Sequence, residues 1–169
     1  MFRPLPMIAL ALAIAPAAGI AAEATASLKN DRQTEIGTVT LMQTPNGVLV
    51  KLDAQGLPAG AHGFHIHETG SCSPDFAAAG DHFNPDGAEH GFENEAGPHA
   101  GDMPNIFADE NGMAKADVLT ASVSLEEGQE GMLLDDDGSA IIIHENPDSY
   151  GKEAGAGGRI ACGVIEAQG

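Results

Sequence analysis

The chain has 169 residues, of which 25 are acidic and 7 are basic, and its formal net charge is −18. This length favours one domain with a sizeable core over two smaller domains. The charge excludes a nucleic-acid-binding role, because such proteins need a basic face that displaces counterions.

Residues 1–22 are predicted to be a secretory signal peptide, with cleavage after one of its last two alanines. Arg3 gives a short basic start, residues 7–20 are apolar or small, and small residues lead out of the run. The alternative is a membrane anchor, but an anchor needs about 20 apolar residues and Pro16 interrupts this stretch. We therefore expect export, with no membrane contact once the signal is removed.

The mature chain, residues 23–169, contains short stretches in which apolar and polar residues alternate. Residues 37–42 and 48–52 flank a Pro-Asn-Gly turn, which predicts a β-hairpin. Further short strands are predicted at 64–67, at two places within 114–125, at 138–144 and at 158–164. This pattern favours an all-β sandwich or barrel.

Residues 68–105 break the pattern, because they carry almost no strand signal. A loop this long inside a compact domain is usually functional or disordered. Its content favours function, since it holds three of the seven histidines and an aspartate: His82, His90, His99 and Asp102.

The spacing of the histidines predicts a metal site. His65 and His67 stand at positions i and i+2 of a predicted strand, so both side chains point to the same face. His144 ends an apolar strand that can supply a third imidazole, and His99 and Asp102 can serve a second ion from one tight turn. Imidazole suits copper and zinc, and a carboxylate beside imidazoles suits zinc.

The two cysteines, Cys72 and Cys162, predict one disulfide, because an even number of cysteines in an exported chain usually pairs. The alternative is two buried free thiols.

Five sequence fragments then occur in a characteristic order: Gly63-Phe64-His65-Ile66-His67, Gly80-Asp81-His82-Phe83-Asn84-Pro85, His90-Gly91, Gly97-Pro98-His99-Ala100-Gly101-Asp102, and Gly158-Arg159-Ile160-Ala161-Cys162-Gly163-Val164-Ile165. Together they resemble the copper/zinc superoxide dismutase family, specifically its exported bacterial branch. The resemblance runs from about Ser27 to Ile165, which is nearly the whole mature chain.

The resemblance implies one copper and one zinc per subunit, with ligands at matching positions of this chain. The implied copper ligands are His65, His67, His82 and His144, and the implied zinc ligands are His82, His90, His99 and Asp102. His82 would bridge the two ions through a deprotonated ring and act in catalysis. His62 is left over and is interpreted as a residue without a metal role.

The resemblance also implies roles around the metals. Asp148 would link the rings of His65 and His90, and Arg159 would lie beside the open face of copper. The cysteine pair would tie the long loop to the last strand. The implied fold is a flattened, eight-stranded antiparallel Greek-key β-barrel with long metal-binding loops.

One position and one segment depart from the family's bacterial pattern. Asp81 stands where a glycine or proline is usual, and it places a negative charge near the site. The segment 148–159 is about two residues short, which makes a steering role for Lys152 doubtful.

The implied function is disproportionation of superoxide to dioxygen and hydrogen peroxide in the periplasm. Copper would carry the electron, since zinc has no redox chemistry. The main alternative is an exported copper- and zinc-buffering protein on the same fold without turnover, and a structural adhesion domain is a weaker one. The resemblance leaves monomer and homodimer open.

Overall fold

The computed structural model describes residues 22–168, so that nearly all of the predicted signal peptide, residues 1–21, lies outside the described residues. The regular elements of the described chain are all β-strands except for one short 3₁₀ helix, η1. In order, the elements are β1 (Glu23–Asn30), β2 (Glu35–Thr44), β3 (Gly47–Ala54), β4 (Gly60–His62), β5 (Phe64–His67), η1 (Phe76–Ala79), β6 (Ile106–Ala108), β7 (Ala114–Thr120), β8 (Ala140–His144), β9 (Arg159–Val164) and β10 (Glu166–Ala167).

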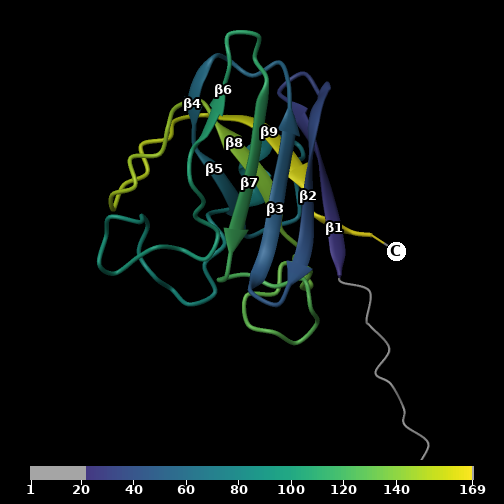
Figure 1. The fold of residues 1–169 in the computed structure, drawn as a ribbon, viewed down its shortest axis with the longest axis vertical. Coiled ribbons are helices and arrows are strands. Elements are labelled where there is room, and N and C mark those ends of the chain that lie inside the picture. The colour runs from purple at the N-terminus through teal and green to yellow at the C-terminus, as the bar shows by residue number, and fades with distance from the viewer. Residues whose placement is uncertain (1–21, 169) are drawn as a thin grey trace, which may run out of the picture.

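The strands form a curled antiparallel sheet, which confirms the predicted all-β fold. Its order is β5-β8-β9-β1-β2-β3-β7, with β10 added to β1, while β4 and β6 form a separate two-stranded sheet. The half of the sheet with β2, β3 and β7 lies in front of the half with β5, β8 and β9 (Figure 1). The connections from β3 to β5 and from β7 to β8 run between these halves, as in a Greek key.

Alternation along the strands fills the space between the two halves. One side of β1, β2 and β3 is buried and includes Leu28, Leu41 and Val50. These residues share one core cluster with Ile141 and Ile143 of β8. Burial of each such side chain contributes about 1.5–3 kcal/mol, so this alternation is the main source of stability.

Strand β8 is buried on both of its faces. Ile141 and Ile143 point into the main core, whereas Ala140 and Ile142 pack with Phe76 of η1 and with Cys162. The long loop therefore covers the outer face of the strand that ends in His144.

The predicted hairpin is confirmed, with Leu41 opposite Val50 and Thr44 opposite Gly47. Of the two strands predicted within 114–125, only β7 forms, and the second is wrong. There Ser124 makes an isolated bridge to Met132, and the Leu125 N–H donates to the Gln43 side chain. The Gln43 side chain thus accepts the hydrogen bond that the backbone of a neighbouring strand would otherwise have accepted from Leu125.

The loop 68–105 is held against the sheet at several points. The predicted disulfide between Cys72 and Cys162 is confirmed, and it attaches the loop to β9. Isolated bridges pair His65 with Asp102 and His67 with His82. Gly101 permits this approach, because a Cβ there would lie 2.3 Å from the Ile66 carbonyl oxygen. Within residues 22–168, no helix is long and apolar enough to cross a membrane.

Candidate metal centre

Strands β5 and β8 deliver three histidines to one place. His65 and His67 are buried on β5 and, as the i, i+2 spacing predicts, share a face. β5 pairs with β8, and His144 at the end of β8 is fixed by its N–H, which donates to the Gly63 carbonyl. The ring centroids of His65 and His144 are 4.9 Å apart, and those of His65 and His82 are 4.1 Å apart.

Two groups of four side chains converge, and they share His82. In each group the nitrogen and oxygen atoms that can serve as ligands all lie within 4.8 Å of one another. One group consists of His65, His67, His82 and His144; the other consists of His82, His90, His99 and Asp102. Among the described residues these are the only groups of this kind.

The Asp102 carboxylate lies at the centre of the second group. One of its oxygens is 2.8 Å from His82 Nδ1, and the other is 2.9 Å from His90 Nδ1. His99 Nδ1 is 3.5 Å away, and neither it nor His90 Nδ1 forms a hydrogen bond in this structure. Close approach without hydrogen-bond geometry is what ligands of a common ion show. The donor set of three imidazoles and one carboxylate fits zinc.

Unpaired ring nitrogens mark the ligand positions. Within the part of the chain that the structure describes, five buried histidine nitrogens have no hydrogen-bond partner, and they belong to five different rings of the two groups: His65 Nδ1, His67 Nε2, His90 Nδ1, His99 Nδ1 and His144 Nε2. In His67 the opposite nitrogen, Nδ1, is 3.0 Å from the Gly80 carbonyl oxygen. A hydrogen bond there places the ring proton away from the centre and leaves a lone pair for a metal.

Burial favours the neutral form of four of these imidazoles. It lowers the pKa of His67 to about 2 and that of His144 to about 3, and it lowers the pKa of His65 and His99 as well. Burial opposes ionisation of Asp102, but hydrogen bonds from His82 and Gly91 outweigh it and hold the pKa of Asp102 well below its usual value. Neutral imidazoles and an ionised carboxylate are the forms that bind metal ions.

These shifts predict how the stability of the metal-free protein depends on pH. An unfolded chain protonates its histidines near pH 6.5, whereas folded His67 and His144 stay neutral to about 2 and about 3. Below pH 6.5 the unfolded state therefore binds more protons, so stability falls as the pH falls, by about 1.4 kcal/mol per ring and pH unit. Calorimetry of the metal-free protein between pH 7 and pH 5 should show a falling Tm. A constant Tm would mean that the folded rings take up protons.

Asp148 connects the two groups of side chains by contacting one histidine of each. It is buried, and one of its carboxylate oxygens is 2.7 Å from His65 Nε2 while the other is 3.1 Å from His90 Nε2. Burial opposes its ionisation, but hydrogen bonds from His65 and Tyr150 dominate and lower the pKa of Asp148 to about 2. The carboxylate thus contacts one ring of each group and restricts the orientation of both.

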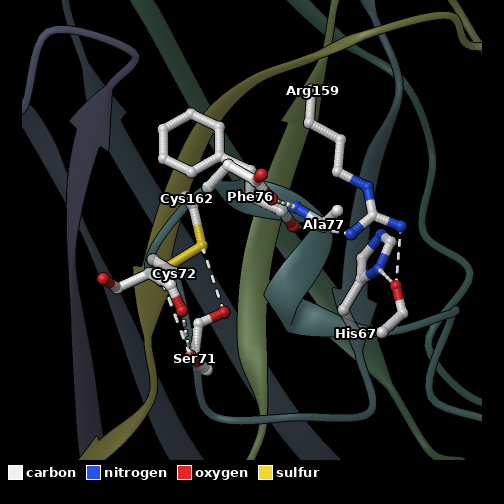
Figure 2. Close-up of a disulfide and its surroundings, with 10 residues drawn as sticks. His67, Ser71, Cys72, Phe76, Ala77, Arg159 and Cys162 are labelled. Atoms are coloured by element: carbon white, nitrogen blue, oxygen red, sulfur yellow. Dashed lines mark hydrogen bonds between the residues drawn. A yellow bond between two sulfur atoms is a disulfide. The ribbon is translucent and has the colours of Figure 1, made fainter.

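Arg159 lies beside the histidines and is held by the long loop. Its two terminal nitrogens donate to the carbonyls of Phe76 and Gly80, both at 2.6 Å (Figure 2). The Gly80 carbonyl also accepts from His67, so one oxygen fixes both side chains. Burial lowers the pKa of Arg159, and the negative charges of Asp81 and Asp75 oppose this shift. The departure at position 81 therefore places a carboxylate where it acts on the arginine.

The charge of Lys152 is compensated in the structure. Its ammonium group is 2.7 Å from the Glu89 carboxylate, and both side chains are exposed. An ion pair offers little long-range attraction to an anion, which agrees with the doubt about its steering role.

His62 was not identified as important from the sequence, yet it is buried and both of its ring nitrogens face carbonyl oxygens. Its Nδ1 is 2.8 Å from the His144 carbonyl oxygen, and its Nε2 is 2.7 Å from the Pro58 carbonyl oxygen. Both partners are backbone groups, which leave no pattern in the side chains of the sequence. His62 belongs to neither metal group, but it supports the backbone of His144.

Replacing His62 with alanine should destabilise the protein by about 2–3 kcal/mol, because a hydrogen bond to a backbone carbonyl and a buried ring are lost. Chemical denaturation measures this change. The metal content of the purified variant should match that of the unmodified protein, and loss of one metal equivalent would instead identify His62 as a ligand.

Comparisons with known proteins agree with this geometry. The family model for copper/zinc superoxide dismutase (SODC) matches residues 35–165. "Superoxide dismutase [Cu-Zn] 2" of Aquifex aeolicus is 48% identical over 147 residues, which cover 85% of this chain and 86% of the relative. "Superoxide dismutase [Cu-Zn]" of Caulobacter vibrioides is 44% identical over 148 residues, which cover 85% of both chains.

A related solved structure is that of a SOD-like protein from Bacillus subtilis. It aligns with a TM-score of 0.79 and 38% sequence identity, and the alignment covers 84% of this chain and 97% of that chain. The structural alignment extends over most of both chains, and residues 35–165 of the family model include the strands and the loop that carry the two metal groups. This chain belongs to the copper/zinc superoxide dismutase family.

Proposed function

We propose that this chain disproportionates superoxide at a centre in which His82 bridges copper and zinc. His65, His67 and His144 would complete the copper site, and His90, His99 and Asp102 would complete the zinc site. The observation that carries the proposal is that two groups of four ligands share one ring, because His82 belongs to both.

In the reaction, two superoxide anions and two protons give one dioxygen and one hydrogen peroxide, so one anion loses the electron that the other gains. Copper supplies the one-electron couple, and zinc supplies a fixed positive charge. His82 Nδ1 faces Asp102 at 2.8 Å, which leaves Nε2 of the same ring to hold or release a proton. We assign to His82 Nε2 the uptake of a proton in the first half of the cycle and its delivery to the developing peroxide in the second. Water supplies the other proton.

Arg159 orients the substrate. Its guanidinium is fixed by two carbonyls, is half-buried and keeps its positive charge next to the histidines. A planar cation with forked donors suits a small anion such as superoxide. Because salt screens distant charges within about 10 Å, this local cation matters more than the net negative charge of the molecule.

Measuring metal content together with superoxide consumption tests the function. Protein loaded with copper and zinc should consume superoxide, and protein loaded with zinc alone should not. Full loading without turnover would favour the metal-buffering alternative.

We also propose export to the periplasm with removal of residues 1–22. The charge and apolar pattern of this segment support the proposal, and so does the disulfide, since oxidising compartments preserve such bonds. N-terminal sequencing of the protein from a periplasmic fraction should give Ala22 or Glu23 as the first residue. An intact Met1 in the cytoplasmic fraction would contradict export.

A homodimer is a further proposal. Phe107 of β6 and Leu119 of β7 are large apolar side chains that are strongly exposed, with exposed fractions of 72% and 56%. Sedimentation equilibrium should give twice the mass of the mature chain. A mass that equals one chain at all concentrations would exclude the dimer.

A further inference from the structure

Tyr150 stands out in the segment between β8 and β9, because its backbone adopts a left-handed conformation. Its φ is +64°, a value that few residues other than glycine and asparagine adopt. Such a conformation persists where the surroundings over-determine it, and it is common next to functional sites. The contacts of Tyr150 show what fixes it.

Each polar group of Tyr150 makes a separate hydrogen bond. Its N–H donates to a carboxylate oxygen of Asp148 at 2.6 Å, and its carbonyl accepts from the Glu93 N–H at 2.8 Å. Its hydroxyl accepts from the Asn105 N–H at 2.7 Å. The ring lies against Phe92, with centroids 5.5 Å apart.

Asn105 also binds Asp148, through the backbone of that residue. Its side-chain oxygen accepts from the Asp148 N–H at 2.7 Å, and its side-chain amide donates to the Asp148 carbonyl at 2.9 Å. The main chain of Asp148 is therefore clamped by Asn105, and Asn105 is in turn held by Tyr150.

The clamped segments are those that carry candidate zinc ligands. Glu93 and Phe92 follow His90, and Asn105 follows Asp102. Gly91 permits the approach, since a Cβ there would lie 2.3 Å from the Tyr150 carbonyl oxygen. In Figure 1 the teal loop and the yellow-green segment before β9 extend from the same side of the sheet.

We propose that Tyr150 is a positioning residue for the zinc site. It fixes Asp148, which orients His90, and it ties together the two parts of the loop that supply His90 and Asp102. The proposal rests on the zinc ligands assigned above. It predicts that zinc affinity depends on a side chain that contacts no metal ligand.

Two substitutions separate the groups involved. Tyr150→Phe removes the hydroxyl alone, and Tyr150→Asn removes ring and hydroxyl while keeping a residue that tolerates the left-handed backbone. Groups that orient metal ligands usually account for about 10- to 100-fold in metal affinity. We expect the zinc dissociation constant, measured by competition with a chromogenic chelator, to rise about tenfold in the first variant and more in the second.

Ser149→Ala is the matched control. Ser149 neighbours Tyr150, and its hydroxyl donates to the Glu153 carbonyl, so this variant also removes one hydroxyl from the segment. It should bind zinc as the unmodified protein does. Equal weakening in Ser149→Ala would overturn the proposal, because the effect would then come from general loosening of the segment.

Two further measurements separate positioning from folding and from the ligand assignment. The Tm of metal-free Tyr150→Phe should stay close to that of the unmodified protein, and the visible spectrum of Co(II) bound in place of zinc should change. A lowered metal-free Tm with unchanged zinc affinity and Co(II) spectrum would make Tyr150 merely structural. His90→Ala should lose zinc, and normal zinc binding by this variant would refute the ligand assignment. If His90→Ala loses zinc but Tyr150→Phe binds zinc normally, the ligand assignment stands and the positioning role is refuted.

Discussion

Replacing His82 with alanine should lower zinc affinity by more than about 100-fold, which exceeds the usual effect of removing a group that only orients a ligand. The ring is the one member common to both groups, and its Nδ1 is 2.8 Å from Asp102. Copper should bind more weakly but detectably, because three imidazoles of its group remain. Elemental analysis after dialysis against a weak chelator measures both effects.

The His82 variant also tests the proton role. With copper restored at saturating concentration, turnover should fall more steeply toward high pH than in the unmodified protein, since water alone must then supply both protons. His62→Ala removes a buried histidine that belongs to neither group but contacts the backbone of His144, so it measures how much turnover changes through that contact alone. Undiminished turnover of His82→Ala with full metal content would refute the bridging role.

The sequence predicted the parts of the site that follow from local periodicity. The i, i+2 spacing of His65 and His67 on a strand was enough to place both rings on one face, and the structure confirms it. The period-two pattern also located the β2–β3 hairpin. In both cases the geometry is fixed within a few residues, where strand pleat determines direction.

Contacts between distant segments could not be obtained in this way. Asp148 meets His65 across 83 positions and His90 across 58, and only the resemblance to a family indicated these pairs. The roles of His62 and Tyr150 escaped prediction, because most of their partners are backbone groups, which any sequence supplies. The wrong strand after β7 has another cause, because there the Gln43 side chain, distant in the sequence, replaces a strand partner.

Reversing the charge of Arg159 should have the second large effect. Arg159→Glu should lower the second-order rate constant for superoxide by on the order of 100-fold at low salt, the usual loss when one fixed donor to a developing anion is removed. The effect combines lost orientation with a new repulsion beside Asp81, whose charge already acts on this position. Pulse radiolysis at several salt concentrations measures the rate constant directly.

Two control variants separate charge from geometry. Lys115→Glu changes the net charge by the same amount, but Lys115 is exposed on β7 and paired with Asp53, so its rate constant should stay within about twofold, as screening of distant charge implies. Arg159→Lys keeps the charge and loses the forked donors to Phe76 and Gly80, so its rate should lie between those of the unmodified protein and Arg159→Glu. Equal losses in Lys115→Glu and Arg159→Glu would mean that the overall field governs the approach of superoxide, and Arg159 would then have no special place beside copper.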